Sequence, residues 1–170
     1  DLALYFLDFP PIVEVSGTAR SQFGTREDYA FVEMWGDDVG PQGFDVDDSA
    51  TAFIRTARGQ TISLDVAWAT NRPTNDEFIL RGAEAGARFE RATHELTVFE
   101  DSKAGQDHLT DAEITTQSTD THKAEQRYFI EHVGSETAPE RNTVDEGLAV
   151  QKVIDAIYRS SEAGRAISFD

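Results

Sequence analysis

The chain of 170 residues lacks cysteine, so neither disulfide bonds nor cysteine-held metals can support its fold. Lysine is scarce, and the only lysines are Lys103, Lys123 and Lys152. No apolar run is long enough to cross a bilayer, and no signal-peptide pattern is present. These absences predict a protein of a reducing compartment. We expect the protein to be cytoplasmic and to have no contact with a membrane.

Two classes of binding sequence are also missing. The glycines never fall as G-x-G-x-x-G after a strand, and they form no P-loop, so the chain itself is predicted to bind no nucleotide. The histidines do not have the spacing of metal ligands, and we expect no metal site. They are His94, His108, His122 and His132.

Two short motifs could suggest catalysis. Asp47-Asp48 could form an acid or metal pair, but in a chain with 32 acidic residues we interpret them as acidic residues at the start of a strand. Ser160-Ser161 lies near a helix end, where serine commonly bonds to the backbone, and we do not expect a nucleophile there. We therefore predict no catalytic residue in this chain.

The chain has a net charge of −17, from 32 acidic against 15 basic residues. This excess argues against nucleic acid as a partner, because phosphates would be repelled. The acidic residues are spread along a periodic chain, which does not fit a disordered acidic tail. We predict a salt-loving host, since in molar salt the screening length falls to about 3 Å. The alternative is an acidic protein from an ordinary host.

Hydrophobic periodicity predicts an α+β domain over residues 1–170, with an open, mainly antiparallel sheet and helices on one face. A helix end over 1–8 stops before Pro10-Pro11. A helix over 122–133 and a capped helix from Thr143 to Gly164 follow the strands. The expected strands are 12–21, 49–56, 61–70, 77–81, 87–91, 96–100, 113–119 and 166–169. Between them, 102–111 is expected to be a polar loop.

The last predicted helix carries the clearest signals. Thr143 and Glu146 form a capping box, and Gly164 follows the last turn. Its expected apolar stripe consists of Val150, Val153, Ile154 and Ile157. The first strand alternates so that Val13, Val15, Gly17 and Ala19 share one face.

The other face of the sheet is predicted to carry threonine, serine, small residues and charge. It is either solvated or a polar oligomer interface.

Two segments could contact a ligand. The first is the loop Thr70 to Asn75, directly after Trp68 at the end of a predicted strand. An ordinary hairpin tip is the alternative. The second is Phe31 to Phe44, where Met34 and Trp35 could cover a cleft; alternatively, they form a small apolar cluster that pins the loop.

Several stretches together resemble one family. They are Asp1-Leu-Ala-Leu-Tyr-Phe-Leu, Val46-Asp-Asp-Ser-Ala-Thr-Ala-Phe-Ile-Arg with Arg58-Gly59, Leu80-Arg-Gly-Ala-Glu-Ala-Gly86, and Glu146-Gly-Leu through Val153-Ile-Asp-Ala-Ile-Tyr-Arg-Ser-Ser-Glu-Ala-Gly164. In this order they resemble the C-terminal domain of the glucose–fructose oxidoreductase and inositol dehydrogenase (Gfo/Idh/MocA) superfamily, over nearly the whole chain.

The resemblance implies a dihydrodipicolinate-reductase-like C-terminal domain that binds substrate and forms a homodimer or homotetramer through its open sheet face. It implies an N-terminal Rossmann domain, absent from this chain, that holds NAD or NADP and the catalytic lysine. The family's Asp-x-x-x-His would fall just before Asp1. The substrate would be a sugar, sugar derivative or cyclitol, and this segment alone would be inactive. The residues implied to contact the substrate are Trp68, Asn71, Arg72, Thr74 and Trp35.

Other functions stay open at this point. The chain could belong to a non-catalytic sugar-binding sensor, or it could be a stand-alone oligomerisation module. It could also be an unrelated acidic binding domain. The start at Asp1, inside an apolar helix and without Met or a cap, favours the second half of a longer protein over a stand-alone module.

Overall fold

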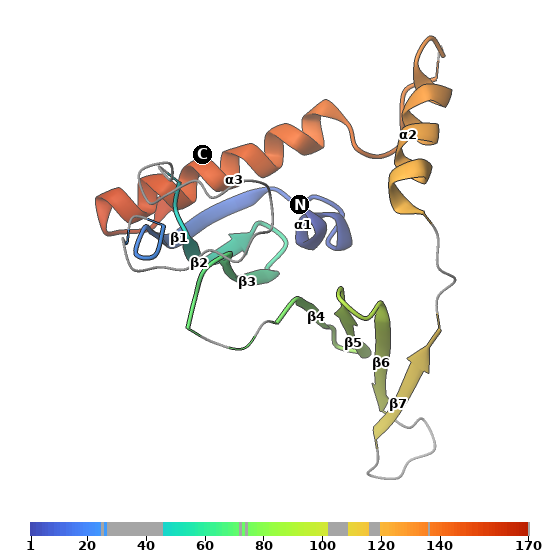
Figure 1. Ribbon diagram of the computed structural model, residues 1–170, viewed down its shortest axis with the longest axis horizontal. Coiled ribbons are helices and arrows are strands. Elements are labelled where there is room, and N and C mark those ends of the chain that lie inside the picture. The colour runs from blue at the N-terminus through green and yellow to red at the C-terminus, as the bar shows by residue number, and fades with distance from the viewer. Residues whose placement is uncertain are drawn as a thin grey trace. The chain divides into compact units, whose positions relative to one another are not determined.

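Figure 1 shows the computed structural model of the chain. It describes residues 1–24, 26, 46–71, 73, 75–101, 109–115, 120–135 and 137–169, except for the side chains of residues 101 and 109. The elements are α1 (Leu2–Phe6), β1 (Ile12–Arg20), β2 (Ser49–Thr56), β3 (Thr61–Ala67), β4 (Glu77–Arg81), β5 (Ala85–Glu90), β6 (Glu95–Asp101), β7 (Leu109–Ile114), α2 (Thr121–His132), α3 (Val144–Ala163) and β8 (Ile167–Ser168). They fall into two compact units, Asp1–Arg72 with Glu140–Asp170, and Pro73–Pro139.

The first unit is an antiparallel sheet with strand order β3-β2-β1-β8, on which α3 packs. Cross-strand register places Val15 beside Ile54 and Gly17 beside Ala52. The core consists of Leu4, Val15, Ala52, Ile54, Val153, Ala156, Ile157 and Ile167. The predicted α+β class is confirmed, with antiparallel strands and a helix on one face, although the strands of the described residues pair in two sheets of four.

The predicted ends of α3 are confirmed. Thr143 Oγ1 accepts from the Glu146 amide at 3.2 Å, and Glu146 Oε2 accepts from the Thr143 amide at 2.7 Å. Gly164 closes the helix in the left-handed region with φ 62°. The predicted stripe was wrong at Ile154, which is 40% exposed. Small side chains take that part of the buried face instead, because α3 lies close to β1; they are Ala156 and Ser160.

The predicted alternation in β1 fails at its start. A register shift between Ile12 and Glu14 marks a bulge, so Ile12 packs against the core while Val13 is 39% exposed. From Val15 onward the predicted phase holds, with Val15 fully buried.

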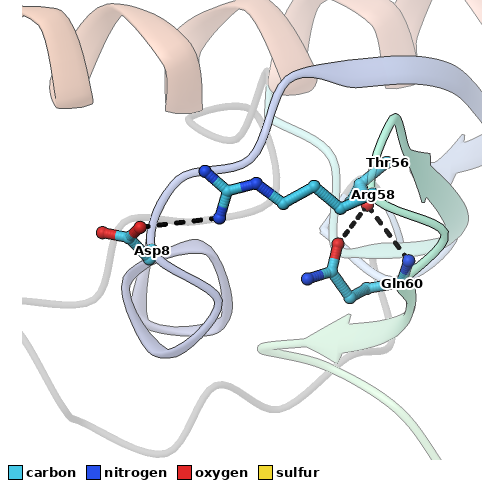
Figure 2. A network of polar contacts seen from close by, with 4 residues as sticks. All are labelled: Asp8, Thr56, Arg58 and Gln60. Carbon is cyan, nitrogen blue, oxygen red and sulfur yellow. Dashed lines mark hydrogen bonds and ion pairs between the residues drawn. The ribbon is translucent and has the colours of Figure 1, made fainter.

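The β2–β3 hairpin has the predicted turn. Gly59 adopts φ 86°, and the Thr56 hydroxyl bonds to both the side chain and the backbone amide of Gln60. From the same turn Arg58 reaches Asp8, with Nη1 3.5 Å from Oδ2 (Figure 2). The Ala57 amide donates to Pro11 O at 2.8 Å, which ties the turn to the segment before β1.

Two serines of α3 complete the free edge of β1. β8 pairs with β1 at Glu14 and Val15, and the Phe169 amide donates to Val13 O at 3.0 Å. Farther along, the Gly17 amide donates to Ser160 Oγ at 2.9 Å, and the Ala19 amide donates to Ser161 Oγ at 3.1 Å. The predicted local backbone bonding is confirmed at Ser160, whose Oγ donates to Arg165 O at 2.8 Å. Both serines also accept from the distant strand β1.

The sheet face of the first unit that points away from α3 is polar, as predicted. Register places the following residues there: Glu14, Ser16, Thr18, Arg20, Ser49, Thr51, Phe53, Arg55, Thr61, Ser63, Asp65 and Ala67. Phe53 is the large apolar member, at 41% exposure, and Arg55 lies over its ring at 5.4 Å. Arg55 also pairs with Glu14 at 3.6 Å.

The second unit contains the antiparallel sheet β4-β5-β6-β7 and helix α2. Cross-strand register separates an apolar face from a face that carries most of the charged residues, together with Ile79 and Phe99. The apolar face carries Phe78, Leu80, Ala87, Phe89, Leu96, Val98, Ala112 and Ile114. The last strand was predicted four residues too late, because β7 begins at Leu109. Leu109 and Asp111 thus belong to a strand, not to the predicted polar loop.

Helix α2 begins at Asp120, whose carboxylate accepts from the Lys123 amide at 3.1 Å. None of its side chains is buried, and its predicted apolar side stays exposed, at Phe129, Ile130 and Val133. Among the helices that the structure describes, none combines the length and apolar character needed to cross a membrane.

Candidate functional site

The candidate site is the end of β3 and the segment that follows it. Of the five residues expected there, Trp68 and Asn71 are described, and both are exposed. Trp35, Arg72 and Thr74 lie outside the described residues.

Trp68 is fixed by two hydrogen bonds to the residues before β2. Its indole Nε1 donates to Asp47 O at 2.8 Å, and its backbone amide donates to Asp48 O at 3.0 Å. The side chain is nevertheless 47% exposed. One edge of the indole is thus anchored to the protein while much of the ring stays accessible, which suits an aromatic platform for an amphipathic ligand.

Asp48 is a buried carboxylate, only 1% exposed. Its Oδ2 accepts from the backbone amides of Gln22 and Phe23, the latter at 2.5 Å, and its Oδ1 accepts from Ser49 Oγ at 3.3 Å. Burial by itself would raise the pKa of Asp48, but the hydrogen bonds from Phe23, Gln22, Ser49 and Gly24 together hold that pKa below its usual value. The carboxylate is therefore charged. Asp48 directly precedes a strand, as predicted, but its side chain is buried.

The carboxylate of Asp47 bonds to two hydroxyl groups. Its Oδ1 accepts from Ser21 Oγ at 2.7 Å. Tyr158 of α3 also bonds to this carboxylate, and burial, together with the hydrogen bond and negative charge of Asp47, raises the pKa of Tyr158. A carboxylate, two hydroxyls and an indole from four separate segments thus meet at one end of the sheet.

This arrangement can bind and orient a polyol. Carboxylate and hydroxyl groups exchange hydrogen bonds with sugar hydroxyls, and an indole face covers the apolar C–H face of a sugar ring. Within the described ranges, no group of three or more histidine, cysteine, aspartate or glutamate side chains could hold a metal ion.

Sequence reasoning found Trp68 but missed Ser21, Asp47, Asp48 and Tyr158 as its surroundings. One signal was present in the sequence. The hairpin register pairs Ser49 with Ala67, so the residues directly before Ser49 must lie opposite those directly after Ala67. Tyr158 could not be found that way, because the packing of α3 on the sheet places it.

The chain is similar to known oxidoreductases. Residues 1–169 match the family described as "Oxidoreductase family, C-terminal alpha/beta domain". A D-glucoside 3-dehydrogenase of Escherichia coli (strain K12) is 22% identical over 167 residues, which cover 98% of this chain and 45% of that protein.

Solved structures show the same fold. An aldose-aldose oxidoreductase from Caulobacter crescentus complexed with glycerol superimposes with a TM-score of 0.69 at 19% identity, over 98% of this chain and 44% of that one. A UDP-N-acetylglucosamine 3-dehydrogenase from Acidithiobacillus ferrooxidans gives 0.64 at 15% identity, over 95% and 43%. The chain thus spans just under half the length of these relatives.

Proposed function

Since the chain belongs to the oxidoreductase family and matches its C-terminal alpha/beta domain, we propose that it is the substrate-binding and oligomerisation domain of an NAD(P)-dependent enzyme that acts on a hydroxyl of a sugar, sugar derivative or cyclitol. The observation that carries this proposal is the half-exposed ring of Trp68, which is anchored by its indole N–H to the backbone carbonyl of Asp47. The names of the similar proteins, which are sugar dehydrogenases and oxidoreductases, support it.

The proposed division of labour follows from what the chain contains. A nicotinamide cofactor supplies hydride acceptor or donor chemistry, and an upstream Rossmann domain would bind it, since this chain has no glycine-rich nucleotide loop. The side chain that acts as general acid and base on the reacting hydroxyl would also lie upstream. The part of this chain would be to orient the sugar and exclude water, which contribute to rate by positioning.

The proposed contacts group around Trp68. Its ring would cover one face of the sugar, and Asn71, three residues later and exposed, would bond to hydroxyls. We extend the same proposal to Arg72, Thr74 and Trp35 from their places in the sequence.

Two features of the whole chain enter the proposal. The polar sheet face around Phe53 would form a homodimer or homotetramer interface. The net charge of −17 supports a salt-loving host. We expect the free energy of unfolding to rise as the KCl concentration is raised to the molar range, because salt screens the repulsion between acidic side chains. A free energy of unfolding that does not depend on KCl would count against this host.

The test uses the full-length protein with NAD⁺ or NADP⁺ and a panel of methyl glucoside, UDP-N-acetylglucosamine and myo-inositol. Reduction of the nicotinamide with at least one of these is expected. Trp68→Ala should raise KM by up to roughly tenfold, because an aromatic ring contact contributes about 0.5–1.5 kcal/mol beyond the area it buries. The 170-residue chain alone should neither bind NADH nor turn over. Sugar binding without turnover by the full-length protein would instead support a sensor.

A further inference from the structure

We propose that Asp48 is a positioning residue for the substrate platform, which is the exposed indole ring of Trp68. Asp48 would act through its contacts to the turn after β1 and to the backbone of Trp68. The inference rests on the proposed function, because it assigns a task to a buried group beside the same site. Asp48 itself touches no ligand in this account, since it is 1% exposed.

The side chain of Asp48 holds the turn that follows β1. Its Oδ2 accepts from the amides of Gln22 and Phe23, two consecutive residues just after β1. The carboxylate therefore fixes the backbone of this turn directly after β1.

The backbone of Asp48 holds the other side. Its amide donates to Arg20 O at 2.8 Å, at the end of β1, and its carbonyl accepts from the Trp68 amide at 3.0 Å, just after β3. The preceding residue, Asp47, accepts the indole N–H. One residue thus connects the ends of three strands at the level of the platform.

Other roles for a buried acid do not fit these contacts. Backbone amides surround Oδ2, and their positive ends would repel a metal cation. The same hydrogen bonds keep the carboxylate ionised, and at 1% exposure it lies out of reach of a substrate proton. Its charge instead strengthens its hydrogen bonds to the turn, since charge-assisted bonds are about twice as strong as neutral ones.

The chemistry also ranks two substitutions. In Asp48→Asn, the amide oxygen can still accept from Gln22 and Phe23, but the charge is lost. In Asp48→Ala, both backbone amides lose their acceptor, and a buried unpaired donor is costly. A positioning role therefore predicts a graded series, with asparagine between aspartate and alanine.

The experiment uses the full-length protein with methyl glucoside and the nicotinamide that it accepts. For Asp48→Ala we expect KM to rise roughly tenfold, with a smaller change in kcat, and for Asp48→Asn an increase of about threefold. Asp145→Asn, at an exposed acid in the first turn of α3 and thirteen residues before Tyr158, is the matched control and should change neither. Hydroxyl-radical footprinting, read by mass spectrometry well below the melting temperature, should show faster oxidation of Trp68 in the Asp48 variants.

The outcomes separate the two proposals. If Trp68→Ala raises KM while both Asp48 variants keep the KM and Trp68 oxidation rate of the unsubstituted protein, the positioning role is wrong and the site stands. If Trp68→Ala leaves KM unchanged, the substrate role of the platform is wrong. Should Asp48→Ala fail to fold, Asp48→Asn decides: a lowered melting temperature with unchanged KM and footprint would overturn the proposal.

Discussion

At the residue scale, buried polar side chains of the first unit accept hydrogen bonds from backbone amides of other segments. Asp48 receives the amides of the turn after β1, and Ser160 receives the Gly17 amide and donates to Arg165 O at 2.8 Å. Ser160 is 2% exposed, so its two bonds are shielded from water. Buried polar groups of this kind stabilise a fold because each would be costly if left unpaired.

The acid stability of the protein should reflect Asp48. Its pKa lies below the usual value of 3.8, so its contribution to the unfolding free energy is complete above that pH and is lost as the pH falls through the lower folded-state value. The difference in unfolding free energy between the unsubstituted protein and Asp48→Asn should therefore shrink below about pH 4. Urea unfolding from neutral pH downward measures it, and a pH-independent difference would contradict the assignment.

At the element scale, the close packing of α3 on β1 organises the first unit. A Cβ at Gly17 would lie 3.0 Å from Ile157 Cγ2 and 3.2 Å from both Ala52 Cβ and Thr51 O. Ala156, fully buried, is the small residue on the helix side. The absence of a side chain at Gly17 therefore sets how near the helix can approach the strand.

Gly17→Ala should destabilise the protein by about 1–3 kcal/mol, because the added methyl overpacks the contact with Ile157. Combined with Ile157→Ala, which removes the crowded atom, the total cost should be smaller than the sum of the two single costs. Chemical denaturation of the four proteins gives the coupling. Strict additivity would show that the methyl does not meet Ile157.

The elements of the first unit could be predicted from the sequence where the signal is local. The capping box at Thr143, the left-handed Gly164 and the turn at Gly59 all follow from residue chemistry, and all are confirmed. The buried face of α3 could not be predicted from apolar periodicity alone. Its orientation depends on small residues at the contact with β1, so Ala156 and Ser160 are buried while Ile154 is exposed.

The candidate site, too, could be predicted from the sequence only in part. Trp68 at a strand end is visible in the sequence as a candidate. Its anchoring is not, because the bonds to Asp47 and Asp48 depend on the register of β2 with β3. The buried state of Asp48 is still harder to predict, since acidic residues are common throughout this chain and usually exposed.

At the scale of the whole molecule, several large apolar side chains are exposed, and contacts within the chain do not explain them. The polar face of the first unit carries Phe53 at its centre, and α2 exposes Phe129, Ile130 and Val133. Apolar groups left exposed in this way are typical of surfaces that meet another domain or subunit. This agrees with our proposal that the chain works within a larger assembly.

The proposed oligomer can be tested at Phe53. Phe53→Asp places a charge at the middle of the proposed interface and should shift the full-length protein to monomer, as measured by analytical ultracentrifugation. Leu148→Asp, on an exposed position of α3, is the matched control and should leave the assembly unchanged. The same sedimentation for Phe53→Asp and the unsubstituted protein would exclude this face as the interface.

The most direct test of the central claim, that this chain is the substrate half of a two-domain dehydrogenase, is the intact mass of the native polypeptide purified from its source. The chain weighs 18.8 kDa and covers 44–45% of two similar proteins. The account predicts a mass near twice 18.8 kDa, which leaves room for a cofactor domain. A native mass of 18.8 kDa would contradict it, because the chain would then have to work without any cofactor domain of its own.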